Sequence, residues 1–310
     1  MIKIVFMGTP EFSVPSLEKL SKHENIEVSL VITQEDKKRG RNKLIPTPIK
    51  SKAIELGIEC YEPEKVNSKE SLDKIDEINP DFIVVIAYGQ IIGSHLLEKY
   101  KNRIINIHSS LLPKYRGAAP MQEALLNDDA ETGVCAMLIE KSMDTGDVLD
   151  CVRIKITDEI TIEDIHDNLS LKASDLILNT IINYDEAFAK RITQNDDEAT
   201  YTTKISKDMG HLDFEQPARK LDLKISAFKN WPSTFVYIND EQVKIHKISI
   251  INKYNDNKPG ELFRVDETGI YVNAADKCVV IKEIQFPNKK RMTVSDYIKG
   301  NSIEIGTLLK

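Results

Sequence analysis

The sequence predicts an α/β protein with a Rossmann-like, mostly parallel sheet, helices on both of its faces, and a C-terminal β-barrel domain of the oligonucleotide-binding (OB) type. Three observations predict this. Short apolar runs alternate with helical segments over the first 190 residues. Beyond a polar stretch, turn residues separate five short strands. The length of 310 residues favours two domains, because a typical domain has about 150.

The first domain is expected at residues 1–190. IKIVF at 2–6 is short, apolar and β-branched, as a buried parallel strand should be, and it ends at Gly8-Thr9-Pro10. Further strands are expected at 28–33, near 58, and at 82–87, 104–108, 134–140 and 148–154. Helices are expected at 13–20, 49–56, 68–78, 121–127 and 162–183, and the last of these has apolar positions at helical spacing.

The second domain is expected at residues 208–310, after a linker at 191–207 that is polar and weakly patterned. A helix near 217–228 comes first. Short alternating strands follow at 235–238, 243–251, 261–265, 269–272 and 278–284. A small OB-like barrel fits this spacing, and a sandwich-like fragment remains an alternative.

Composition excludes several classes of protein. Hydrophobic residues make up 41% and charged residues 29%, too apolar a mixture for a disordered chain of net charge -7. No apolar run approaches the roughly 20 residues needed to cross a bilayer, and the N-terminus has no leader pattern, so we expect a cytoplasmic protein. The four cysteines form no CxxC pair, which disfavours a zinc site or a disulfide scaffold and predicts small buried apolar residues.

Charge is unevenly distributed. Residues 207–310 hold 17 basic and 14 acidic side chains, a net +3, which leaves -10 for residues 1–206. Inside this acidic region lies a strongly basic stretch, which contains Lys37, Lys38, Arg39, Arg41 and Lys43. The run follows a strand end, where α/β folds place ligands, although a solvated loop would explain it too.

The first turn offers Gly8 alone and no G-x-G-x-x-G, so it lacks the glycines that let a dinucleotide approach the backbone. Walker loops and G-x-S-x-G elbows are also absent from the sequence. These absences disfavour nucleotide cofactors, phosphoryl transfer and serine hydrolysis.

Three polar residues stand where an open sheet exposes side chains. Asn106 and His108 end an apolar strand, and because they are two residues apart they share a face. Asp144 lies in a loop between two later strands. The largely apolar residues 110–113, followed by Lys114 and Arg116, suit the rim of a pocket for a planar amphipathic ligand.

The motifs NIHSSLLPKYRGAAP and IEKSMDTGDVL resemble the 10-formyltetrahydrofolate-dependent formyltransferases. FMGTPEF, the basic loop, AFKNWPSTF and PNKKRMTVSDYIKG extend the resemblance along the whole chain, and favour the members that act on aminoacylated tRNA. The resemblance implies direct attack of the methionyl α-amino group of initiator methionyl-tRNA on the formyl carbon, through a tetrahedral oxyanion that Asn106 and His108 stabilise. Asp144 would orient the ring of His108 and relay a proton.

The resemblance also implies binding residues. The folate would lie against Ile86, Ala87, Tyr88, Ser110, Leu111, Leu112 and Pro113, with no metal involved. Phe12 would contact the methionine side chain. The tRNA would be held by Lys38, Arg39, Arg41, Lys43, Lys289, Lys290 and Arg291. A monomer is expected.

Other functions are open to the same residues. A formyltransferase for a small amine, such as an amino-sugar nucleotide or a purine-precursor ribotide, would share the three polar residues. The basic loop and the second β domain disfavour it. A formyl-folate hydrolase would need water as nucleophile, and nothing in the sequence selects one. A non-catalytic RNA-binding module is disfavoured because Asn106, His108 and Asp144 are intact.

Overall fold

The computed structural model describes residues 1–39, 43–252 and 256–310, and for residues 37–39 and 43 it describes the backbone. The chain divides into two compact units. Unit 1 comprises residues 1–120, 130–157 and 163–202, and unit 2 comprises residues 121–129, 158–162 and 203–310. The expected domain limits at residues 190 and 208 stay a prediction.

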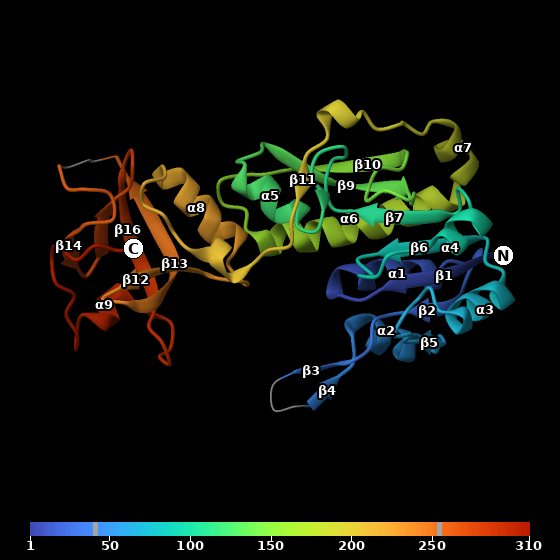
Figure 1. Ribbon diagram of the computed structural model, residues 1–310, viewed down its shortest axis with the longest axis horizontal. Coiled ribbons are helices and arrows are strands. Elements are labelled where there is room, and N and C mark those ends of the chain that lie inside the picture. The colour runs from blue at the N-terminus through green and yellow to red at the C-terminus, as the bar shows by residue number, and fades with distance from the viewer. Residues whose placement is uncertain (40–42, 253–255) are drawn as a thin grey trace. The chain divides into compact units, whose positions relative to one another are not determined.

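Unit 1 is built on a seven-stranded sheet in the order β10-β9-β7-β6-β1-β2-β5 (Figure 1). The two strands on one side, β9 (Glu131–Leu138) and β10 (Val148–Lys155), run antiparallel to their neighbours. The other five are parallel: β1 (Ile2–Gly8), β2 (Ile26–Ile32), β5 (Cys60–Tyr61), β6 (Phe82–Ile86) and β7 (Ile104–His108). The predicted mostly parallel sheet is therefore confirmed.

Helices cover both faces of this sheet. Val5 and Met7 of β1 share one apolar cluster with residues of α3 and α4. Ile4 and Phe6, which point to the opposite face, are fully buried too, so that face is also covered. The helices of unit 1 are α1 (Val14–Ser21), α2 (Pro48–Leu56), α3 (Lys69–Ile78), α4 (Ser94–Lys99), α6 (Ile162–Ile182) and α7 (Tyr184–Ala189). No helix within the described ranges combines the length and hydrophobicity needed to span a membrane.

Local sequence signals set the helix ends. The hydroxyl of Thr47 accepts a hydrogen bond from the Lys50 backbone N–H at the start of α2, and Pro48 occupies the first helical position. Gly57 ends the helix with a φ of 70°, a left-handed conformation that glycine adopts without steric cost. Ser68 caps α3 by accepting from the Ser71 backbone N–H. Each of these signals acts within a few residues of the helix end that it sets.

The basic run after β2 contains two short strands that the sequence did not predict, β3 (Lys37–Arg39) and β4 (Lys43–Ile45). They pair antiparallel, with Arg39 opposite Lys43. At their base, the Lys50 ammonium contacts the carboxylates of Asp36 and Glu62 at 2.6 and 2.7 Å. Arg41 lies outside the described residues.

Unit 2 is mostly an antiparallel sheet in the order β12-β13-β16-β15-β14, with β17 paired to β16. Its strands are β12 (Thr234–Ile238), β13 (Glu241–Ile251), β14 (Leu262–Asp266), β15 (Gly269–Asn273), β16 (Cys278–Gln285) and β17 (Met292–Thr293). Its helices are α5 (Pro120–Leu126, which begins at the end of unit 1), α8 (Ala218–Ala227) and α9 (Val294–Tyr297). The predicted C-terminal β domain is confirmed, and its core includes Ile245, Val272 and Ile281.

The cysteine prediction is wrong for one pair. Cys135 and Cys151 form a disulfide between β9 and β10, with their Cα atoms 4.1 Å apart. The antiparallel register places the two residues directly opposite each other, which a separation of 16 residues in sequence does not reveal. Cys60 and Cys278 are free thiols, and Cys278 is buried as expected. Burial raises the pKa of Cys60 to about 11, so this thiol is poorly reactive at neutral pH.

Candidate active site

The strand order of unit 1 reverses beside β1. The chain goes from β1 to β2 on one side and returns through β6 and β7 on the other. In open α/β sheets, ligands bind at the carboxyl ends of the strands beside such a reversal. There the Thr9 hydroxyl donates a hydrogen bond to the Tyr88 carbonyl at 2.8 Å, joining the turn after β1 to the loop after β6. The expected site therefore lies where the loops after β1, β6 and β7 meet.

Asn106 and His108 lie at the carboxyl end of β7, and Asn106 pairs with Val85 of the neighbouring strand β6. Asn106 is half-buried, whereas His108 is buried. The His108 Nε2 lies 2.9 Å from the Tyr115 carbonyl oxygen. Because a carbonyl only accepts, Nε2 carries the proton, and the ring directs its Nδ1 elsewhere.

Asp144 lies on that other side of the ring. Its Oδ2 is 3.7 Å from His108 Nδ1 and accepts a hydrogen bond from the Gly117 backbone N–H at 2.8 Å. Asp144 has a φ of 55°, a left-handed conformation that Asp tolerates better than most residues. A Cβ atom at Gly146 would lie 2.0 Å from the Leu138 carbonyl oxygen, so the Asp-x-Gly spacing reflects the close approach of this loop to β9. The sequence predicted three residues for the site. The structure brings two of them, His108 and Asp144, together beside half-buried Asn106.

Two loops border these residues. The loop after β6 contains Ala87, which is exposed with a φ of 48°, and Tyr88, which is buried. The hydroxyl of Tyr88 has no hydrogen-bond partner among the described atoms. In the loop after β7, Ser110 is buried and its hydroxyl donates to the Lys114 carbonyl at 2.6 Å. Ile86 ends β6, and residues 111–113 are half-buried.

Comparison with known proteins gives a consistent result. A family model described as formyl transferase matches residues 2–181, and one described as formyl transferase, C-terminal domain, matches residues 204–302. A methionyl-tRNA formyltransferase from Finegoldia magna is 47% identical over 307 residues, which is 99% of both chains. One from Clostridium acetobutylicum is 41% identical over the full length of both. The chain belongs to the methionyl-tRNA formyltransferase family.

Solved structures support the same fold at greater distance. A sugar 3N-formyl transferase, WlaRD, has a TM-score of 0.67 at 23% identity and covers 94% of this chain and 99% of its own. HypX from Aquifex aeolicus, crystallised with tetrahydrofolic acid, has a TM-score of 0.60 at 16% identity over 96% of this chain and 47% of its own. Both likenesses show the fold that this methionyl-tRNA formyltransferase family member shares.

Arg116 was predicted to lie on the rim of a ligand pocket, and this is wrong. Its side chain is 1% exposed, and its guanidinium donates hydrogen bonds to Gln194, Asp196 and the Tyr201 hydroxyl. The acceptors lie within residues 191–207, the polar segment whose sequence predicts a linker. Sequence reasoning missed them because that segment carries no periodic pattern and its contacts span about 80 residues.

Phe12 lies in a short 3-10 helix before α1 and is buried. Its carbonyl accepts a hydrogen bond from Ser170 of α6, and its ring packs edge-on against His166 at 5.4 Å. These contacts are those of a core residue, and contact of Phe12 with a methionine substrate stays a prediction.

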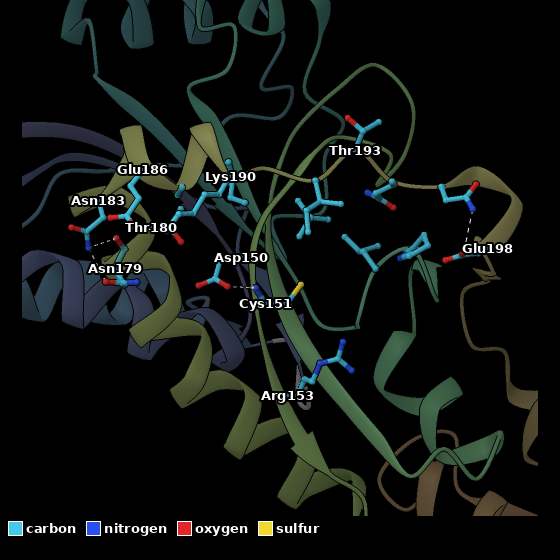
Figure 2. A pocket seen from close by; sticks show the side chains of 18 residues that line it. Asp150, Cys151, Arg153, Asn179, Thr180, Asn183, Glu186, Lys190, Thr193 and Glu198 are labelled. Atoms are coloured by element: carbon cyan, nitrogen blue, oxygen red, sulfur yellow. Dashed lines mark hydrogen bonds and ion pairs between the residues drawn. The ribbon is translucent and has the colours of Figure 1, made fainter.

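A cavity of about 820 Å³ lies beside β10, the C-terminal end of α6, and α7. Figure 2 shows the side chains that line it. Leu112 and Pro113 of the predicted folate loop line it, together with charged residues such as Asp150, Arg153 and Glu186. Asn106, His108 and Asp144 are not among its lining residues. That these three residues carry out the reaction stays a prediction.

The predicted tRNA contacts lie in separate regions of the chain. Lys38, Arg39 and Lys43 belong to the paired strands β3 and β4. In unit 2, Lys289 and Lys290 are exposed, and Arg291 contacts the Glu283 carboxylate at 2.5 Å. Within the described ranges, no group of three or more His, Cys, Asp or Glu residues is arranged to hold a metal ion.

Proposed function

We propose that this protein transfers the formyl group of 10-formyltetrahydrofolate to the α-amino group of methionine esterified to initiator tRNA. One observation carries the proposal: His108 and Asp144 lie 3.7 Å apart beside Asn106 at a strand-order reversal. The full-length match to methionyl-tRNA formyltransferases indicates which acceptor this site serves.

The loops after β6 and β7 suit a folate. Ile86, Ala87 and Tyr88 would offer backbone groups to the pterin edge, since the turn there is exposed at Ala87. Residues Ser110, Leu111, Leu112 and Pro113 would line the other side. Bound formyl-folate supplies an electrophilic formyl carbon.

The side chains act on the charges that change during the attack. The amide of Asn106 donates a hydrogen bond to the formyl oxygen, where negative charge develops. A protonated His108 would add a second donor through its Nδ1, because Nε2 already donates to the Tyr115 carbonyl. The carboxylate of Asp144, held by Gly117, accepts the proton that the attacking amine loses. It then gives this proton to the folate nitrogen as the bond between that nitrogen and the formyl carbon breaks, which releases tetrahydrofolate. The transfer is direct, because the amine itself attacks the formyl carbon and no covalent nucleophile of the protein is needed.

The tRNA would meet two basic surfaces. Lys38, Arg39, Arg41 and Lys43 would contact the acceptor stem, where planar guanidinium groups suit phosphates and base edges. Lys289, Lys290 and Arg291 would attract the tRNA backbone without reading its sequence. This substrate places the reaction in the cytoplasm, and a monomer stays a prediction.

Comparing three candidate amines as substrates identifies the acceptor of the formyl group. The purified protein is incubated with 10-formyltetrahydrofolate and, in parallel, charged initiator tRNA, free methionine or an amino-sugar nucleotide. We expect formyl-methionyl-tRNA as the main product, detected by mass spectrometry after the ester is cleaved. Equal or faster formylation of a small amine would contradict the proposed acceptor. Formate release without any formylated amine would point to a hydrolase instead.

A further inference from the structure

Residues 194–202, called here the strap, contact the catalytic loops far more closely than a linker needs to. β11 (Tyr201–Thr202) pairs parallel with β8 (Arg116–Gly117). The Thr200 hydroxyl accepts a hydrogen bond from the Tyr115 backbone N–H, and the Thr200 carbonyl accepts from the Arg116 backbone N–H, at 2.8 and 2.9 Å. The Thr202 hydroxyl accepts from the Ala119 backbone N–H. Residues 115–119 are therefore held in place by the strap.

The segment that the strap holds is the one that orients both titratable residues of the site. The Tyr115 carbonyl fixes the ring of His108, and the Gly117 N–H fixes the carboxylate of Asp144. A shift of residues 115–117 would therefore move the two side chains relative to each other. Among the described strands, β8 pairs with β11 in a separate two-stranded sheet, so the large sheet does not hold it.

Gln194 joins this segment to the Asp144 loop. Its amide nitrogen donates to the Asp144 and Gly146 carbonyls at 2.9 and 2.8 Å. Its amide oxygen accepts from Nε of buried Arg116 at 3.0 Å. Both N–H groups and the oxygen of this side chain therefore form hydrogen bonds. Only an amide of this length offers two donors and one acceptor at this distance from the backbone.

We propose that Gln194 is a positioning residue for formyl transfer, one that holds the Asp144 loop and residues 115–117 together so that His108 and Asp144 keep their relative orientation. The proposal rests on the function proposed above. Gln194 itself contacts neither catalytic side chain. It acts through the backbone that carries them.

Gln194→Glu tests the contact with the Asp144 loop separately from the contact with Arg116. A glutamate keeps the oxygen that accepts from Arg116. Its second carboxylate oxygen would face the carbonyls of Asp144 and Gly146 and could not donate a hydrogen bond to either. Gln194→Met keeps the volume and loses all three hydrogen bonds. Asn195→Asp is the matched control, because it makes the same amide-to-acid change one residue away, where the side chain contacts Asp197 and Glu198 within the strap.

With charged initiator tRNA and formyl-folate, both Gln194 variants should lower kcat by roughly 10- to 100-fold, since a misplacement of about 1 Å can cost 10²-fold. KM for each substrate should stay within about threefold, and the pH profile of kcat should move with the altered His108–Asp144 geometry. Asn195→Asp should match the unmodified protein. An unchanged kcat, or an equal loss in Asn195→Asp, would overturn the proposal.

Hydrogen exchange supplies a readout that does not need activity. The amides of residues 115–117 should exchange faster in both Gln194 variants than in the unmodified protein or Asn195→Asp. Unchanged exchange would overturn the positioning role even if kcat falls. An inactive unmodified protein whose exchange follows the expected pattern would instead overturn the proposed function and leave the structural link standing.

Discussion

Two His–Asp pairs of unit 1, each formed by residues distant in sequence, look alike by composition and differ in everything around them. His95 of α4 lies 2.9 Å from Asp76 of α3, and Lys99 contacts the same carboxylate oxygen at 2.9 Å. His108 and Asp144 are farther apart, at 3.7 Å. The His95 side chain is 47% exposed, whereas that of His108 is 7% exposed. By distance alone, the first pair would be taken for the functional one.

The difference lies in how each pair is held. His95 and Asp76 stand on helices, and an ion pair half open to solvent contributes little. His108 and Asp144 are each fixed on a further side by the backbone of residues 115–117, in a place sheltered from water. Electrostatic effects are larger there, and the groups need no reorganisation when charge develops. The backbone that holds a pair therefore identifies a catalytic site better than a short distance does.

The sharpest test makes the same change in both pairs. Asp144→Asn should lower kcat by about 10²- to 10⁴-fold, because it removes the proton acceptor and keeps the side-chain volume. Asp76→Asn should leave kcat within about twofold. Steady-state formylation of charged initiator tRNA measures both, and formyl-folate affinity should be unchanged in each. Comparable losses in the two variants would erase the distinction between the pairs.

Asn106 belongs to the same strand as His108 of the buried pair, two residues before it. Asn106→Ala should lower kcat by roughly 10²- to 10³-fold, the usual effect of losing one donor to a developing oxyanion. Asn168→Ala, on the exposed side of α6, is the control and should have no effect on kcat. A rise in KM at constant kcat would instead assign Asn106 to substrate binding.

The basic residues of unit 2 test whether attraction of tRNA is separate from either pair. Replacing Lys289, Lys290 and Arg291 together by Ala should weaken tRNA binding several-fold. The slope of log Kd against log salt should fall by about 2, given roughly 0.7 to 0.9 per neutralised phosphate. The value of kcat at saturating tRNA should not change. Lys282→Ala is the control, because the Lys282 ammonium donates a hydrogen bond to the Thr268 carbonyl. If replacing all three basic residues left the slope unaltered, they would not contact the tRNA.

The smallest effect belongs to the exposed pair. Burial alone would raise the pKa of Asp76, but hydrogen bonds from Lys99, His95 and Tyr100 hold that pKa below its ordinary value. When folding lowers the pKa of a carboxyl group, the resulting stabilisation is fully present above the pKa of the unfolded state. It is lost as the pH falls through the pKa of the folded state. Asp76→Asn should thus cost about 1 kcal/mol in urea unfolding at pH 7. The difference should shrink progressively below about pH 5, and a constant difference would contradict the assigned cause.

Much of the fold could be predicted because its signals are local. Apolar β-branched runs, capping residues such as Thr47 and Ser68, and glycines such as Gly57 act within a few positions of the chain. The basic run was recognised by composition, but its pairing as β3 and β4 was not, because a run of charged and polar residues gives no strand alternation. The Cys135–Cys151 disulfide was missed for a related reason, since it depends on the register between two strands.

The sequence by itself determined the chemical groups of the site, because Asn106 and His108 share a strand face by their spacing and the motif around Asp144 is local. Only the tertiary structure decided how those groups are held. Arg116 became a buried anchor and Gln194 a link between loops through hydrogen bonds spanning about 50 to 80 residues. Hydrogen bonds between distant segments depend on the packed backbone, and no local pattern in a polar segment encodes them.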